Sequence, residues 1–131
     1  MLDAATGKKV GTIKLDGAPE FGVSDGAGKL YVNLEDAGAI EELDARSLTV
    51  TRHWSIAPCT KPTGLALDRE HHRLFSGCRN KVMAISDAMA GRVLKTVPID
   101  GGLDANAFAA TTQHPFTPNG AHPATSAHAC P

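Results

Sequence analysis

The sequence predicts an all-β fold in which one unit, a four-stranded antiparallel sheet, is repeated along the chain. Residues 61–99 hold one complete copy of this unit. Three turn signals, at 68–70, 78–80 and 87–91, divide the segment into four apolar runs that are short enough to be strands. Apolar residues alternate or form short blocks, and no window has the three-and-four spacing of a long amphipathic helix.

The unit recurs with a constant period. Three aspartates open a turn at the same place in successive units, at intervals of 41 and 43 residues: Asp3, Asp44 and Asp87. The strand after this turn closes at the same intervals, on Leu15, Ile56 and Ile99. A period of roughly 40 to 45 residues made of four short strands is typical of a propeller blade. The sequence therefore predicts a partial β-propeller of about three four-stranded antiparallel blades.

The repeated positions also give the boundaries of the predicted blades. Residues 2–16 are the last hairpin of an incomplete blade, 17–57 the second blade, 58–99 the third, and 100–108 the start of a fourth. Propellers close with about four to eight blades, so we expect residues 1–108 to be an incomplete ring from a longer protein. The uncovered blade faces of an open ring favour self-association.

Alternation within the first two units predicts which side chains are buried. In the first hairpin these are Val10, Ile13 and Leu15. In the second blade they are Phe21, Val23, Leu30, Val32, Ile40, Leu43, Val50, Trp54 and Ile56. The turns suit β-hairpins, because Gly7 and Gly91 tolerate the positive φ angles that tight hairpin turns require.

The pattern stops after Phe108. Residues 109–131 contain no Leu, Ile or Val and no charged side chain, while four of the eight prolines lie there. Such a segment buries too little apolar surface to offset the entropy of ordering it, so we expect a low-complexity, disordered or loosely docked tail. Its candidate zinc ligands have spacings that match no zinc motif, so no metal site is predicted among them: His114, His122, His128 and Cys130.

Several short sequence segments resemble the YVTN-type repeats of bacterial β-propellers, the YncE-like proteins. They are Tyr31-Val32-Asn33, the segment 62–68, and Thr6-Gly7-Lys8 with Val10. The resemblance covers residues 2–108 and implies a WD-like, all-β propeller fold. It also implies a periplasmic or secreted parent protein that acts in binding, since family members are largely exported and mostly of unassigned biochemistry.

Composition restricts the partners. The 13 Lys and Arg residues nearly balance the 14 Asp and Glu residues, so no basic surface indicates nucleic acid binding. There is no apolar run of about 18 residues, so no membrane span is predicted. The N-terminus lacks the basic-then-apolar order of a signal peptide.

Four residues are candidate ligand-binding groups. Glu20, Thr63 and Asp104 recur at intervals of 43 and 41 residues, each at the start of the innermost strand of its blade, and Asn106 lies nearby. In a propeller these positions face the mouth of the central channel. They either satisfy backbone groups at the strand start or hold a ligand, and carboxylates with a hydroxyl suit a hard divalent cation such as calcium.

Two cysteines flank the first hairpin of the third blade. Cys78 is expected opposite Thr63, and a loop that folds back brings Cys59 near it. A disulfide needs Cα atoms within about 7 Å. In an oxidising compartment the pair is either bonded or remains as two thiols, with Cys130 unpaired. The adjacent His71 and His72 lie on a predicted turn, point apart, and are expected to be solvated.

Three functional hypotheses follow. The first is a non-catalytic propeller that binds a protein or a small molecule, since no Ser-His-Asp arrangement, Cys-x-x-Cys pair or phosphate loop is present. The second is a fragment of a metal-dependent lactonase or gluconolactonase-like enzyme, in which Glu20, Asp104 and Asn106 are remnants of the metal site. The third is a fragment without activity of its own, because three blades cannot complete a channel.

Overall fold

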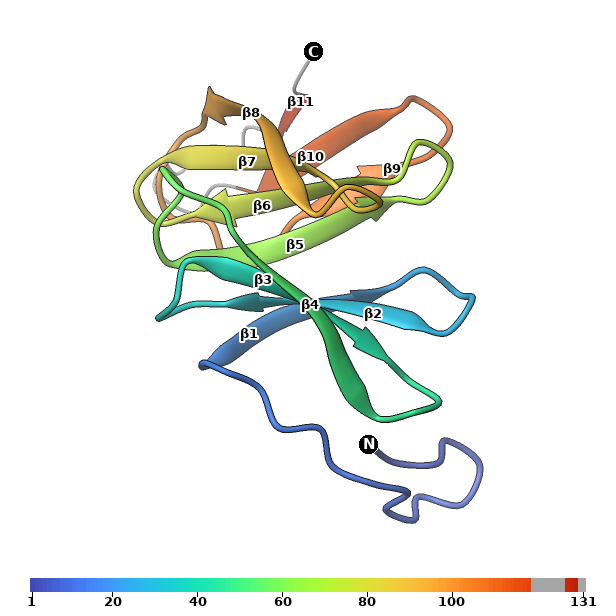
Figure 1. Ribbon diagram of the computed structural model, residues 1–131. Helices are drawn as coiled ribbons and strands as arrows, with labels where there is room; N and C mark the ends of the chain where they lie inside the picture. Colours follow the sequence, from blue (N-terminus) through green and yellow to red (C-terminus); the bar gives the residue numbers. More distant parts are fainter. Residues whose placement is uncertain (119–126, 130–131) are drawn as a thin grey trace.

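A computed structural model describes residues 1–118 and 127–129 and is all-β within them. The first sheet has the order β1-β2-β3-β4 and the second the order β5-β6-β7-β8, while the third has the order β11-β10-β9 (Figure 1). The first-sheet strands are β1 (Pro19–Ser24), β2 (Lys29–Leu34), β3 (Ala39–Asp44) and β4 (Thr49–Ser55). The second-sheet strands are β5 (Pro62–Asp68), β6 (Arg73–Cys78), β7 (Val82–Asp87) and β8 (Arg92–Pro98). The third-sheet strands are β9 (Ala107–Ala109), β10 (His114–Pro118) and β11 (Ala127–Ala129).

The first two sheets repeat one design, which confirms the predicted fold class. Both are antiparallel meanders, and both carry irregularities at matching places. The register shifts between Glu42 and Leu43 in one sheet and between Ile85 and Ser86 in the other. These sheets are two successive blades of an unclosed propeller, and within the described residues no helix has the length and hydropathy to cross a membrane.

The three aspartates of the period open the same turn in each unit. Asp44 Oδ1 accepts hydrogen bonds from the amides of Arg46 and Ser47, both at 2.8 Å. Asp87 Oδ1 and Asp3 Oδ1 accept the equivalent pairs of amides in their own turns. These backbone hydrogen bonds lower the pKa of all three carboxyl groups below the usual 3.8. A local side-chain contact therefore sets the repeated turn.

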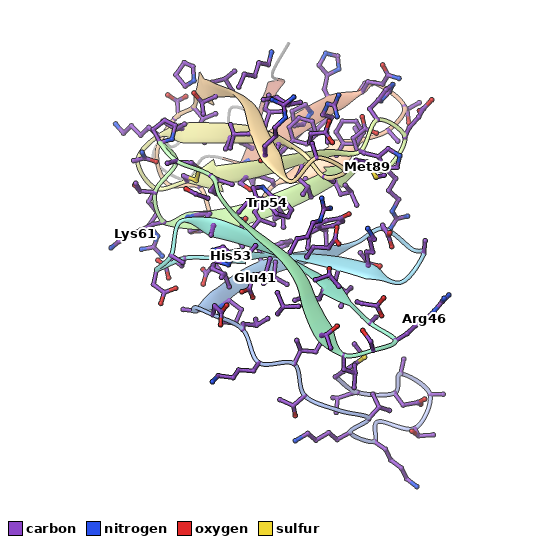
Figure 2. The ribbon with its side chains drawn as sticks, in the orientation of Figure 1. Glu41, Arg46, His53, Trp54, Lys61 and Met89 are labelled. Carbon is purple, nitrogen blue, oxygen red and sulfur yellow. A yellow bond between two sulfur atoms is a disulfide. The ribbon has the colours of Figure 1, made fainter. Side chains whose placement is uncertain are left out.

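The main core lies between the two blades. Tyr31 and Trp54 of the first blade cluster with Leu65 and Leu74 of the second, and Figure 2 shows Trp54 where the two sheets meet. Strand β1 packs on β5, and β5 packs on β9, so these three are the innermost strands of the three sheets. Their ends therefore define the two mouths of the central channel. We call this open arrangement of three successive sheets the fan.

The first hairpin differs from the prediction. Only one bridge, Leu2 to Lys9, forms in residues 2–16, and Val10 is 54% exposed. Ile13 and Leu15 are only half-buried, because no neighbouring strand pairs with this segment among the described residues. In the second blade Phe21 is 37% exposed, since it lies where β1 shifts register against β2.

Part of the predicted tail forms strands where the structure describes it. Strand β10 pairs with β9 on one side and with β11 on the other. Backbone hydrogen bonds order this sheet without large aliphatic side chains, and Pro115 and Thr117 are buried in it. The side chains of His122, His128 and Cys130 lie outside the described residues, so the prediction made for them is not tested.

Candidate binding site at the ends of the innermost strands

The two buried residues of the predicted mouth are held by backbone carbonyls. Thr63 Oγ1 donates a 3.0 Å hydrogen bond to Leu103 O. Asn106 Nδ2 donates to Gly64 O at 3.1 Å and to Phe75 O at 3.0 Å. These side chains join the second blade to the segment before β9, which is the backbone-satisfying alternative that the sequence left open.

The two acidic residues of the predicted mouth lie at the surface. Glu20, near the start of β1, and Asp104, before β9, are both exposed. The structure therefore does not draw all four predicted residues into one polar cluster, since Thr63 and Asn106 are buried and bound within the protein.

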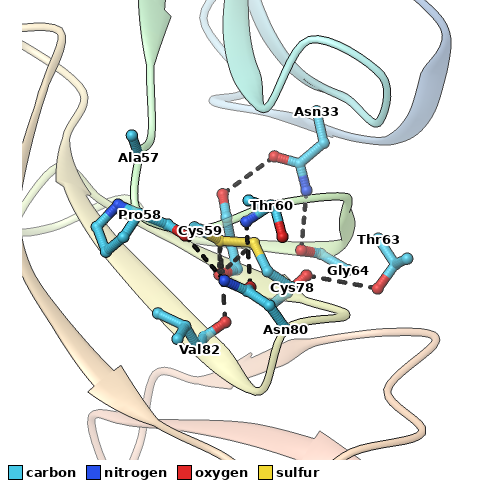
Figure 3. Close-up of a disulfide and its surroundings, with 12 residues drawn as sticks. Asn33, Ala57, Pro58, Cys59, Thr60, Thr63, Gly64, Cys78, Asn80 and Val82 are labelled. Atoms are coloured by element: carbon cyan, nitrogen blue, oxygen red, sulfur yellow. Dashed lines mark hydrogen bonds between the residues drawn. A yellow bond between two sulfur atoms is a disulfide. The ribbon is translucent and has the colours of Figure 1, made fainter.

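The two cysteines of the third predicted blade are joined. Cys59 and Cys78 form a disulfide with their Cα atoms 5.6 Å apart (Figure 3). Asn80 holds the same loop, because its Nδ2 donates to Pro58 O at 2.8 Å and its Oδ1 accepts from the Thr60 amide at 3.1 Å. The connection between the two blades is therefore fixed to the β6–β7 turn by one covalent bond and two hydrogen bonds.

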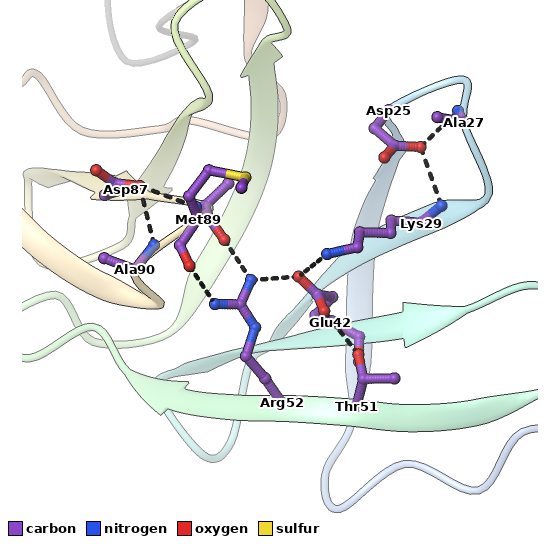
Figure 4. Close-up of polar contacts among 10 residues, drawn as sticks. Asp25, Ala27, Lys29, Glu42, Thr51, Arg52, Asp87, Met89 and Ala90 are labelled. Atoms are coloured by element: carbon purple, nitrogen blue, oxygen red, sulfur yellow. Dashed lines mark hydrogen bonds and ion pairs between the residues drawn. The ribbon is translucent and has the colours of Figure 1, made fainter.

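The two blades also meet through one arginine. Arg52 Nη1 donates to Met89 O at 2.7 Å, and Nη2 contacts both Ala88 O and the carboxylate of Glu42 (Figure 4). The guanidinium also lies 5.5 Å from the centre of the Trp54 ring. Burial raises the pKa of Glu42, but hydrogen bonds from Arg52 and Thr51 outweigh it and lower the pKa below 4.5.

A well-formed cavity lies at the opposite ends of the innermost strands from the predicted mouth. We call it the channel-end pocket; it has a volume of about 480 Å³. It lies between the last residues of β1 and β5 and the region that follows β9. Its lining consists of Val23, Ser24, Leu67, Asp68, Arg69, Glu70, Phe108, Ala110 and Gln113.

Hydrogen bonds hold two walls of this pocket in place. Arg69, directly after β5, donates from Nε and Nη2 to Ser24 O, at 3.2 and 3.0 Å. Asp68 accepts hydrogen bonds from the Glu70 amide at 3.0 Å and from the ring of His71 at 2.7 Å. The third wall is rigid as well, because Phe108 stacks on Phe75 with ring centres 5.5 Å apart. The pocket is therefore preformed.

The pocket has apolar walls and a net negative polar rim. Val23, Leu67 and Phe108 supply apolar surface. Two carboxylates, Asp68 and Glu70, stand against one guanidinium, and that guanidinium is already bound to a carbonyl. Such a pocket suits a ligand that combines an apolar body with a basic group.

Sequence reasoning missed this pocket. Ser24 and Asp68 end the first strands of their blades and lie 44 residues apart, the same interval that separates Leu30 from Leu74. The repeat that located Glu20 and Thr63 at one end of these strands therefore also held a signal for the other end. The end of the strands at which a cavity forms depends on side chains from three units. A repeat period along the sequence does not reveal how these side chains pack together.

Comparison with known proteins supports the fold through structure alone. No protein-family model matches the sequence, and no curated protein matches it. The hydrazine synthase of Kuenenia stuttgartiensis matches with a TM-score of 0.72 and 15% identity, over 86% of this chain and 33% of that chain. The Cps50 (Swd1) β-propeller domain of Myceliophteria thermophila matches with a TM-score of 0.65 and 16% identity, over 93% of this chain and 40% of that chain.

The WD40 repeats of RRP9 are also similar, with a TM-score of 0.68 and 16% identity over 79% of this chain and 33% of that chain. Two of these three structures are named as propellers or WD40 repeats, so the class of this chain is a partial β-propeller. The chain spans 33% to 40% of the length of these structures. At such identities the likeness concerns the fold alone.

Proposed function

We propose that this chain is part of a non-catalytic, YncE-like β-propeller that binds a polypeptide segment with a basic side chain. The observation that carries the proposal is the preformed channel-end pocket at the ends of β1, β5 and β9. Its volume of about 480 Å³ falls within the range of about 300 to 1,000 Å³ typical of ligand sites. Its walls are held by the protein's own hydrogen bonds, so binding needs little reorganisation.

A peptide is the favoured occupant for two reasons. The three apolar walls fit a side-chain stem, while the carboxylates of Asp68 and Glu70 attract a terminal cation. The pocket also opens at one mouth of the fan, where an extended chain can approach without threading between blades. The parent protein is proposed to be periplasmic or secreted, and the disulfide between Cys59 and Cys78 supports an oxidising compartment.

The test is fluorescence anisotropy with two labelled hexapeptides that differ only in a central Arg or Glu. We expect the Arg peptide to bind more tightly. Glu70→Lys is expected to weaken its binding about fivefold, the size of one partly exposed charge contact. Glu20→Lys is the matched control, because it places the same charge change on an exposed residue near the other end of β1.

Three results would contradict the proposal. Equal binding of both peptides, or no binding of either, would remove the channel-end pocket as a site for basic side chains. A loss of binding in Glu20→Lys but not in Glu70→Lys would move the site to the mouth that the sequence predicted.

A further inference from the structure

Three metal-ligating side chains meet on the first blade, away from the channel-end pocket. Glu41 on β3 is the cross-strand partner of His53 on β4, and Asp16 comes from the segment before β1. One ligand atom from each lies within 4.8 Å of the others. Figure 2 labels Glu41 and His53 side by side on their strands.

The position of the cluster follows from the alternation of the strands. Ile40 and Trp54 turn toward the second blade, where they belong to the main core. Their neighbours Glu41 and His53 therefore face the other side of the sheet. The N-terminal segment runs along that side (Figure 1), and the Asp16 amide donates a 3.2 Å hydrogen bond to Glu41 Oε1. Two strands and one segment thus converge on one carboxylate.

Glu41 is the unusual member of the cluster. Its side chain is completely buried, at 0% exposure, and its Oε2 has no hydrogen-bond partner. A buried carboxylate oxygen without a hydrogen-bond partner is energetically costly, so such atoms are rare unless something satisfies them. A cation that both oxygens of the Glu41 carboxylate contact would satisfy Oε2 while Oε1 stays beside His53.

The spacing also suits shared coordination. His53 Nδ1 lies 3.2 Å from Glu41 Oε1, which is long for a charge-assisted hydrogen bond of about 2.7 to 2.9 Å. Two ligands of one tetrahedral ion, each about 2.1 Å from the metal, are separated by about 3.4 Å. His53 and Asp16 are both exposed, so an ion can enter from solvent and keep an open position.

We propose that Asp16, Glu41 and His53 form a site for a divalent transition metal of the zinc class. One imidazole and two carboxylates match the ligands that Zn²⁺ accepts, and two negative charges balance its charge. An imidazole ligand disfavours calcium, which prefers oxygen ligands. The bound ion links the segment before β1 to strands β3 and β4 of the first blade.

The experiment is calorimetric titration of the full chain with Zn²⁺, followed by thermal unfolding with and without the ion. We expect His53→Ala and Asp16→Asn each to weaken binding at this site by at least about tenfold. Both residues are exposed, so both variants should fold. His71→Ala is the matched control, since His71 also pairs with a carboxylate, that of Asp68 at 2.7 Å, outside the cluster.

Two further readouts separate this site from histidines and cysteine in the tail. Zn²⁺ should shift the ring resonances of His53 in NMR spectra, and it should raise the Tm of the wild type more than that of His53→Ala. Ca²⁺ at the same concentration should do neither. Unchanged zinc affinity in both His53→Ala and Asp16→Asn, or an equal loss in His71→Ala, would overturn the proposal and leave Glu41 and His53 as a simple hydrogen-bonded pair.

Discussion

Asn33 and Asn106 lie in different units of the fan, yet both donate a side-chain amide hydrogen bond to the carbonyl oxygen of Gly64. The two distances are 2.9 and 3.1 Å. Asn33 Oδ1 also accepts a 3.0 Å hydrogen bond from Ser76 Oγ. Position 64 has no room for a larger residue, because a Cβ there would lie 2.6 Å from the backbone of Ala105. Three successive units therefore meet at one carbonyl on strand β5.

Replacing Asn33 should weaken the whole fan. Asn33→Ala removes two buried hydrogen bonds and leaves Ser76 Oγ without its acceptor, so we expect a loss of about 2 to 3 kcal/mol in the free energy of unfolding. Urea unfolding measures this loss. Thr111→Ala, at an exposed position, should change the stability by less than about 0.5 kcal/mol. Equal effects of the two substitutions would contradict the role of the shared carbonyl.

Replacing Arg52 should lower stability and also change its dependence on pH. Arg52→Met leaves the buried Glu42 without its guanidinium, and about 2 kcal/mol should be lost near pH 7. In the wild type the folded pKa of Glu42 is lowered, so its contribution is present above about pH 4.5 and is lost as the pH falls through the folded value.

The acid limb of the stability curve therefore distinguishes Arg52→Met from the wild type. The variant should lose less stability between about pH 5 and 3, because only Thr51 and Lys29 then oppose the rise that burial causes in the pKa of Glu42. Lys95→Met, at an exposed position on β8, is the control and should keep the wild-type slope. Parallel curves for the wild type and Arg52→Met would show that the contact does not govern Glu42.

The only tyrosine of the chain gives a direct measure of the interface between the blades. Burial of Tyr31, together with the nearby carboxylate of Glu42, raises the pKa of its phenol to about 12. The folded protein should therefore show little phenolate absorbance at about pH 11, while the urea-unfolded chain should titrate near about 10. The stability that Tyr31 contributes is present below pH 10 and is lost as the pH rises toward 12. Half-ionisation near pH 10 in folded protein would mean that the ring is not buried.

The disulfide should account for two of the three cysteines. Unreduced protein should therefore titrate one thiol. The cross-link joins residues 19 positions apart, and a closed loop of this length stabilises by about 3 kcal/mol. The variant Cys59→Ser with Cys78→Ser should lose about that amount in urea unfolding. Three free thiols in unreduced protein would contradict the pairing.

The residues explain which features the sequence predicts and which it does not. Asp44 and Asp87 bind amides two and three positions further along the chain, so their turns are visible in the sequence. The cluster of Glu41 with His53 depends on cross-strand register, and its third member comes from a separate segment. A sequence pattern reveals residues that recur at regular intervals along the chain. It does not reveal that residues from two strands and a separate segment meet in space.

The strands of the tail and the pocket escape sequence reasoning for other reasons. Composition predicts a disordered or loosely docked tail over residues 109–131 because the segment lacks large aliphatic residues, and it does not report the backbone pairing of β10 with β9. The repeat placed candidate residues at one end of the innermost strands, whereas the cavity lies at the other. Glu70 lines this cavity, whereas Glu20 lies near the other end of β1.

The central claim is that β1–β4 and β5–β8 are two successive blades packed face to face, and one NMR measurement tests it directly. Trp54 on β4 is the only tryptophan, and its Cε3 lies 3.5 Å from where a Cβ at Gly91, in the β7–β8 turn, would stand. The account predicts a strong nuclear Overhauser effect between Trp54 Hε3 and the Gly91 Hα protons in the folded chain. Its absence, with the strands of both sheets intact, would contradict the packing of the two blades.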